Sequence, residues 1–379
     1  MTAATQPIRF MADNYAALST STVTGSSALS SFPVSNVVDE LRYKQWMPKG
    51  NFTIDSTNNK LYFDDGSAQT ATITPGDYAG PAALATEIQT QLLAESAETF
   101  TCTYNTTSYK FEIACSTAAY ELTITSTSNA IWDTIGFTGV ADITKGSGET
   151  ATADEIRNHT SEWIKVDCAV STKMDFVALI GPLNEAFTLS SSATVTLEGN
   201  TSDSWSSPAF SLALSVDSQG AMQFLDSEST RTYRYWRLVF EDKTNSNGPE
   251  SFVFGHWYLG AYDTVTTSNI EKGFTVNQVD PSIMVQSENG AKFFNRRTNY
   301  LTFSGAQMLY VSASERRTLQ QQFYDLGVHT PFYISLDPSL EVSTEYQEYT
   351  RYVYFPKEPS FQHVYKDYYS IAFDLQEAN

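Results

Sequence analysis

The chain has 379 residues, with 23 lysines and arginines against 43 aspartates and glutamates, and a formal net charge of −20 at pH 7. A chain of this length is expected to hold two or three domains with a sizeable buried core. The acidic excess repels phosphate backbones and anionic membrane surfaces, so no nucleic acid is expected among its partners.

The N-terminal part of the chain divides into two segments. Residues 1–50 contain turn residues and short apolar pieces that cannot pack alone. Residues 51–150 resemble a self-contained unit, in which short strand patterns surround one helical stripe. In that stripe, Leu84, Ile88 and Leu92 recur every four residues and predict a helix of about three turns. Residues 51–150 therefore predict a small α+β module.

A β-hairpin and a connector follow the helix. Residues 99–116 predict two strands with a turn at residues 105–108, which places Tyr104 opposite Tyr109. Residues 139–153 are rich in glycine, threonine and alanine, and they predict a connector that returns the chain to an all-β region.

The remaining chain is expected to be rich in strands. Residues 151–265 hold strand patterns separated by serine, aspartate and glycine turns, a spacing that favours a β-sandwich. Residues 266–379 hold further strands and one helix. The helix is indicated by Ser312 and Glu315, which form a capping box, and by Gly327, which supplies the stop signal.

The number of cysteines and the length of the apolar runs indicate whether the protein is disulfide-bonded, inserted in a membrane or secreted. Cys102, Cys115 and Cys168 are too few for a disulfide framework and are expected to be buried. No apolar run approaches about 18 residues, so no membrane insertion is expected. The N-terminal residues lack the basic and apolar segments of a secretion signal. Release from a cell would then require lysis or assembly into a particle.

Catalytic signatures are absent from the sequence. It contains no His-Glu-x-x-His, Gly-x-Ser-x-Gly or Cys-x-x-Cys motif and no phosphate loop. Asp64 and Asp65 form the best local carboxylate pair, but the following Gly66 favours a turn. His329 directly follows a helix stop, which favours a structural role. We therefore expect no enzyme, with no catalytic residue, no cofactor-binding residue and no metal ligand assigned; a structural metal site is left open and unplaced.

Glycan binding requires exposed aromatic faces beside short polar side chains. Trp46 and Trp205 fall in or near loops and are the candidate glycan-contacting residues. For Trp205, packing of the loop against the sandwich is the competing interpretation.

Two separated stretches of the chain resemble a galactose-binding-like, discoidin-type jelly roll. The first begins with Phe-Pro-Val-Ser-Asn at residue 32 and ends at Trp46. The second includes Trp-Ile-Lys-Val-Asp at residues 163–167 and Tyr-Trp-Arg-Leu-Val-Phe at residues 235–240. In this family the second stretch ordinarily follows soon after the first. The resemblance therefore implies that residues 51–150 are inserted into a loop of the jelly roll.

Other stretches resemble structural proteins of tailed-bacteriophage tail tips and baseplates, of the distal-tail-like kind. They include Pro-Ile-Arg-Phe-Met-Ala-Asp-Asn-Tyr at residues 7–15 and Leu-Gly-Val-His-Thr-Pro-Phe at residues 326–332. The resemblance implies a virion protein of the tail, made in the host cytoplasm, that contacts other tail or baseplate proteins. It also implies a homo-oligomer, either a ring or a trimer. The alternative is a carbohydrate-binding module that contacts a glycan on the host cell surface.

Together these observations predict a mainly β chain with three parts. A jelly-roll β-sandwich of residues 1–50 and 151–265 is interrupted by the α+β module of residues 51–150, and a β-rich assembly domain with one helix follows at residues 266–379. Aromatic residues make up 13% of the chain, and many of them lie in this last domain, where they suit an interface. The candidate interface residues are Phe293, Phe294, Phe332, Tyr333, Tyr352, Tyr354, Tyr368 and Tyr369.

Overall fold

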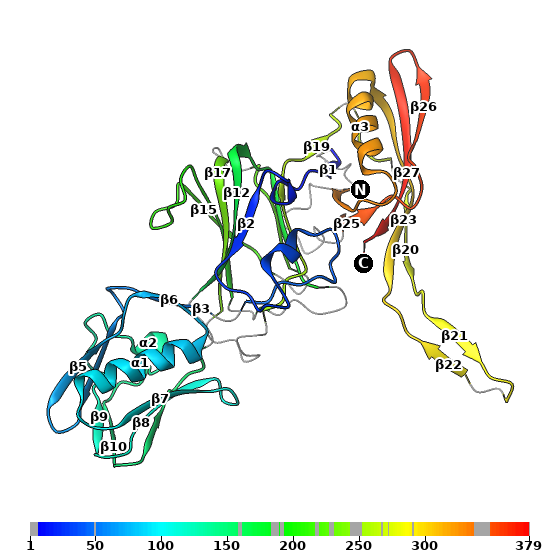
Figure 1. The fold of residues 1–379 in the computed structure, drawn as a ribbon. Coiled ribbons are helices and arrows are strands. Elements are labelled where there is room, and N and C mark those ends of the chain that lie inside the picture. The colour runs from blue at the N-terminus through cyan, green and yellow to red at the C-terminus, as the bar shows by residue number, and fades with distance from the viewer. Residues whose placement is uncertain are drawn as a thin grey trace.

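The computed structural model describes residues 7–48, 51–157, 161–182, 189, 193–216, 220–226, 231–242, 252–266, 268–271, 273–289, 292–336 and 349–378. Across these ranges the protein is mainly β, with several antiparallel sheets and three α-helices (Figure 1). The predicted predominance of strands is thereby confirmed.

Two antiparallel sheets enclose the first core, and we call them the sandwich. The larger sheet has the strand order β15–β14–β17–β12–β2, and the smaller has the order β16–β13–β18. Their strands are β2 (Thr22–Gly25), β12 (Glu162–Lys173), β13 (Phe176–Ile180), β14 (Thr194–Asn200), β15 (Phe210–Leu214), β16 (Gly220–Phe224), β17 (Thr232–Glu241) and β18 (His256–Gly260). Along β14, buried Val195 and Leu197 alternate with more exposed neighbours, as expected of a sheet with one buried face.

The smaller sheet of the sandwich is covered on both faces. Val177 and Leu179 of β13 belong to the sandwich core. Phe176 and Ala178 of the same strand belong to a different cluster, which they share with residues of the C-terminal sheet such as Tyr333. This double burial explains why β13 is apolar at every position.

Residues 51–157 form a module with its own core. Its sheets have the orders β10–β9–β4–β5, β11–β8–β7 and β3–β6. Its elements are β3 (Asn51–Ile54), β4 (Lys60–Asp64), β5 (Ala68–Thr72), β6 (Gly76–Ala79), α1 (Pro81–Glu95), β7 (Phe100–Asn105), β8 (Lys110–Cys115), β9 (Tyr120–Leu122), α2 (Trp132–Ile135), β10 (Ile143–Lys145) and β11 (Thr150–Thr152). Helix α1 buries Leu84, Ile88 and Leu92, which confirms the helix predicted from their spacing.

Two local predictions for this module were wrong. The β7–β8 hairpin pairs Tyr104 with Phe111 and not with Tyr109. Residues 139–153 are not only a connector, because they contribute the strands β10 and β11, which pair with β9 and β8 of the module. Ala151 of β11 is fully buried in the module core, so the module continues past residue 150.

The C-terminal sheet includes a strand from the beginning of the chain. Its path is β19–β1–β24–β25–β27–β23–β20, with β26 paired to β27. The strands are β1 (Arg9–Met11), β19 (Asp263–Thr264), β20 (Thr275–Val279), β23 (Tyr300–Ser312), β24 (Phe332–Ser335), β25 (Thr350–Tyr354), β26 (Ser360–Tyr365) and β27 (Tyr368–Glu377). Residues 9–11 therefore lie in this sheet, although the sequence analysis placed residues 1–50 in the sandwich.

Helix α3 (Ala313–Leu326) packs on the C-terminal sheet through Leu319, Phe323 and Leu326. The backbone N–H of Glu315 donates a hydrogen bond to Ser312 Oγ at 3.4 Å, and the backbone N–H of Ser312 donates to Glu315 Oε2 at 3.4 Å. The predicted capping box is therefore confirmed.

A two-stranded ribbon continues from the end of the C-terminal sheet at which β20 and β23 pair (Figure 1). It consists of β21 (Ile283–Gln286) and β22 (Lys292–Asn295), which pair only with each other in the described structure. All eight strand residues are exposed. We call residues 283–286 and 292–297 the arm.

Candidate functional site

Trp46 is part of the sandwich core and not of a binding surface. Its side chain is fully buried and stacks on Phe254, with 5.3 Å between the ring centroids. Its indole N–H donates to the backbone carbonyl of Ser27 at 2.9 Å. Because both ring faces are covered, Trp46 cannot contact a glycan, and this candidate is corrected to a core residue.

Trp205 remains on the surface and is half-buried. Its indole N–H donates to Asp203 Oδ1 at 2.7 Å. The guanidinium carbon of Arg237 lies 4.4 Å from its ring centroid, and Arg237 is itself held by Glu198, whose Oε2 accepts a 2.8 Å hydrogen bond from Arg237 Nε. This stacking fixes the orientation of the indole and leaves part of it open to solvent.

The surroundings of Trp205 form a continuous surface on the outer side of the larger sandwich sheet. Lys165 Nζ donates to Asp203 Oδ2 at 2.7 Å and lies 5.4 Å from the ring centroid of Trp163. The hydrogen bond from Lys165 holds the pKa of Asp203 below its usual range, which keeps this carboxylate charged. We call Trp163, Lys165, Asp203, Trp205 and Arg237 the Trp205 face.

A polar cleft of about 630 Å³ borders this face. Trp163 and Arg237 of the sandwich contribute to its wall, together with residues of the α+β module. Its carboxylates are Asp55, Asp77, Asp133 and Glu241, and its short polar side chains include Thr53, Asn58 and Thr134. Aromatic, amide and carboxylate groups thus converge where the module meets the sandwich.

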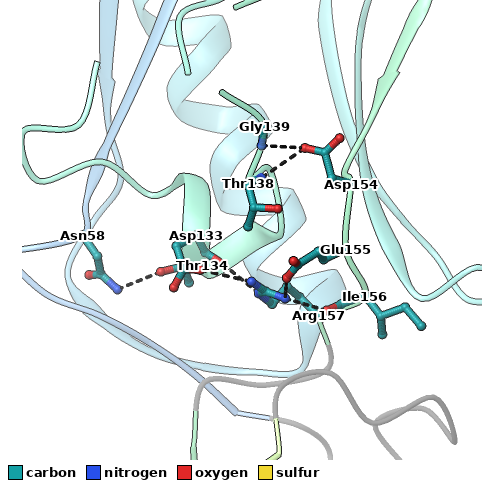
Figure 2. Close-up of polar contacts among 9 residues, drawn as sticks. All are labelled: Asn58, Asp133, Thr134, Thr138, Gly139, Asp154, Glu155, Ile156 and Arg157. Atoms are coloured by element: carbon teal, nitrogen blue, oxygen red, sulfur yellow. Dashed lines mark hydrogen bonds and ion pairs between the residues drawn. The ribbon is translucent and has the colours of Figure 1, made fainter. Parts of the chain in front are cut away.

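Arg157 braces the module side of this cleft (Figure 2). Its side chain is only 4% exposed. Nε donates to the backbone carbonyl of Asp133 at 2.8 Å, Nη2 lies 3.1 Å from Asp133 Oδ1, and Nη1 donates to Glu155 Oε2 at 2.7 Å. The neighbouring Asn58 donates from Nδ2 to Thr134 Oγ1 at 3.2 Å. Arg157 therefore positions Asp133 directly, whereas Asn58 and Thr134 hold each other.

The candidate interface residues differ sharply in exposure. Phe293 and Phe294 on the arm are 63% and 62% exposed, and Tyr368 is 41% exposed. Tyr354 and Tyr369 are half-buried, and the ring of Tyr369 has the Arg316 guanidinium over it at 4.7 Å. The arm therefore carries the most exposed aromatic pair among the candidates.

Phe332, Tyr333 and Tyr352 are buried within the chain and cannot face a partner. Phe332 lies in the core beneath α3, whereas Tyr333 and Tyr352 lie between the C-terminal sheet and the sandwich. These three candidates are corrected to core residues, because other elements cover both faces of β24, which carries Phe332 and Tyr333, and the sandwich covers Tyr352 on β25.

A second group of exposed aromatic residues combines Tyr368, which the sequence already marked as an interface candidate, with Tyr310 and Tyr365, which it did not. Tyr310 of β23 and Tyr368 of β27 lie in contact, with 6.4 Å between their ring centroids, and Tyr365 of β26 pairs with Tyr368 across the β26–β27 hairpin. Tyr365 is 71% exposed, and Val364 beside it is also exposed. The Lys-Asp pair between Tyr365 and Tyr368 marks a tight turn in the sequence, and this turn could have indicated that the two tyrosines lie side by side. We call Tyr310, Val364, Tyr365 and Tyr368 the tyrosine patch.

Groups with catalytic potential are buried or dispersed in the described structure. Within the described ranges no group of three His, Cys, Asp or Glu side chains could hold a metal ion. The three cysteines are free and buried, and burial raises the pKa of the Cys168 thiol to about 12. His256 is buried as well, and His159 lies outside the described residues.

None of the helices in the described ranges is long and apolar enough to cross a membrane. Comparison with protein-family models gives no match, and no curated protein is significantly similar to the chain.

Proposed function

We propose that the protein is a structural virion component of a bacteriophage tail tip or baseplate, which acts through protein–protein contacts in a symmetric assembly. The observation that carries this proposal is the arm, on which Phe293 and Phe294 are more than half exposed. Its side chains Ile283, Met284 and Val285 are exposed as well. An isolated two-stranded ribbon is marginally stable in water, and contiguous exposed apolar surface marks an interaction site.

The sandwich suits a scaffold in such an assembly. Its two sheets have five and three antiparallel strands, the total found in a jelly roll. This agreement supports a galactose-binding-like jelly roll into which the α+β module is inserted. The larger sandwich sheet packs on one face of β13, and the C-terminal sheet packs on the other. This packing would hold the arm and the module in fixed relative positions.

Purified protein is expected to associate with increasing concentration into one closed oligomer, which analytical ultracentrifugation and electron microscopy would measure. Images of the native particle should locate the chain at the tail end. A protein that stays monomeric at high micromolar concentration and is absent from purified virions would contradict the proposal.

Glycan binding at the Trp205 face is a second candidate function. It is favoured by the half-exposed indole beside a cleft that presents Thr53, Asn58 and carboxylates, because sugar rings stack on aromatic faces while short polar groups bind their hydroxyls. We expect Trp205→Ala to abolish glycan-array binding. The matched control is Tyr324→Ala, which removes an aromatic side chain that is 82% exposed on α3. Equal binding by wild type and Trp205→Ala would reject this candidate.

A further inference from the structure

The C-terminal sheet carries unlike apolar surfaces at its two ends. The arm extends from the end at which β20 pairs with β23, and the tyrosine patch lies at the other end, beside the β26–β27 turn (Figure 1). Neither surface belongs to any of the buried apolar clusters of the described structure. A self-complementary dimer would need only one such surface, whereas two unlike surfaces suit head-to-tail contacts.

We infer that copies of this chain associate head to tail, with the arm of one copy seated on the tyrosine patch of the next. This inference rests on the proposed function, since it names the partner and the two contact surfaces of that assembly. Each copy would use its arm once and its patch once, so the series closes into a ring where the rotation between copies allows it.

The local backbone supports a dedicated patch. Tyr310 has a φ of 61°, in the left-handed region that bulky residues rarely adopt, and it lies where the β23–β27 pairing shifts register. A bulge of this kind re-aims a side chain. In β23 it leaves Tyr310 exposed beside Tyr368. The patch is therefore a built feature of the sheet and not a scatter of surface residues.

The available area matches what a stable contact needs. The five aromatic side chains of the two surfaces are between 41% and 71% exposed, namely Phe293, Phe294, Tyr310, Tyr365 and Tyr368. A full aromatic side chain has a surface of about 200 Å², so the exposed parts of these five side chains amount to about 600 Å² together. A standard interface buries about 1,600 Å², of which about 900 Å² is apolar. The exposed aliphatic side chains of Ile283, Met284, Val285 and Val364 bring the total near that value when the partner covers both faces of the ribbon, because the pair of Met284 and Phe294 lies opposite to the pair of Val285 and Phe293.

Charge favours the arm as the contacting element. The chain has a net charge of −20, so two copies repel each other over most of their surfaces. The arm is an exception, because Lys292, Arg296 and Arg297 are exposed on it. Arg296 and Arg297 line a hollow with Phe294 and Asp280, so a partner's aromatic ring would meet an apolar wall, two guanidinium groups and one carboxylate. Arginine stacks favourably on tyrosine faces, which is what the patch presents.

The test uses two complementary variants of the full chain. The arm variant is Phe293→Ser with Phe294→Ser, and the patch variant is Tyr310→Asn with Tyr365→Ser, where asparagine tolerates the left-handed backbone. Each variant alone should associate about a hundredfold more weakly than wild type, as when two central aromatic residues are removed from an interface. Tyr324→Ser on α3 is the matched control and should assemble as wild type does.

Mixing the two variants gives the decisive result. The arm variant keeps an intact patch and the patch variant keeps an intact arm, so we expect one-to-one heterodimers that grow no further, measured by native mass spectrometry. Wild type that assembles while the mixture stays monomeric would overturn the head-to-tail contact and leave the proposed function standing. Wild type that never assembles would overturn both.

Discussion

Replacing Trp46 by alanine is expected to lower the free energy of unfolding of the sandwich by about 3–5 kcal/mol. The side chain is fully buried between Phe254 and Phe240, and its indole N–H donates to the Ser27 carbonyl, so truncation leaves a cavity and removes this hydrogen bond. A domain's whole stability is only about 5–15 kcal/mol, so the variant should lie close to unfolding at room temperature. Urea titration followed by circular dichroism measures the change.

The control for this prediction is Trp205→Ala, a tryptophan-to-alanine change on the same sandwich. Trp205 is half-buried and stacks on Arg237 at the surface, so its loss should cost about 1 kcal/mol or less. The two variants therefore distinguish a loss of folding stability, expected for Trp46→Ala, from a loss of glycan binding, expected for Trp205→Ala. A Trp46→Ala protein as stable as wild type would show that the packing of this side chain contributes little.

These two tryptophans show where sequence reasoning reaches its limit. Both lie among polar residues, and the local pattern predicts a loop for each. Trp46 is buried because it forms a bridge with Phe254, which is more than two hundred residues away in the chain. A pairing so distant leaves no trace in the flanking residues, and only the fold distinguishes the core tryptophan from the surface one.

The predicted aromatic interface failed in part for a related reason. Adjacent residues on a strand point to opposite faces, and a strand with one open face would expose one of Phe332 and Tyr333. Both are buried, because β24 has α3 on one side and the sandwich on the other. Phe293 and Phe294 form the same kind of pair, but nothing in the described structure covers either face of β22. The sequence cannot tell these two pairs apart.

Signals contained within one element were interpreted correctly. The apolar stripe of α1 and the capping box of α3 depend on neighbours only three or four residues apart. The β7–β8 hairpin was recognised, but its pairing was wrong by two residues, because Asn105 pairs with Lys110 and the turn lies one residue later, where Asn105 Oδ1 accepts hydrogen bonds from the N–H groups of Thr107 and Ser108. A shift of two residues keeps each side chain on its face, so Cys102 was still expected in the core.

Acidification from pH 7 to about pH 5 is expected to weaken the contact between the sandwich and the C-terminal sheet through His256. This side chain is buried, its ring stacks on Tyr352 with 4.7 Å between centroids, and its Nδ1 lies 3.2 Å from Tyr333 Oη. Burial is the largest cause that lowers the pKa of His256; together with nearby Arg42, and against the opposing charge of Asp39, it brings this pKa from 6.5 to about 3.

The sign of the effect follows from this lowered pKa. The folded protein holds His256 neutral, whereas the unfolded chain binds a proton below about pH 6.5. The stabilisation is therefore complete above pH 6.5 and is lost as the pH falls towards 3. One proton taken up only on unfolding costs about 2 kcal/mol of stability by pH 5. Urea unfolding across this pH range measures the slope.

His256→Phe isolates this contribution, because phenylalanine keeps the stacking on Tyr352 but cannot be protonated. The variant should be about 1 kcal/mol less stable than wild type at pH 7, since the hydrogen bond with Tyr333 is gone, and about 1 kcal/mol more stable than wild type at pH 5, since it lacks the proton uptake of His256. Carboxylates elsewhere titrate alike in both proteins and cancel in the comparison. Identical pH slopes for wild type and variant would mean that a proton reaches His256 without opening the interface.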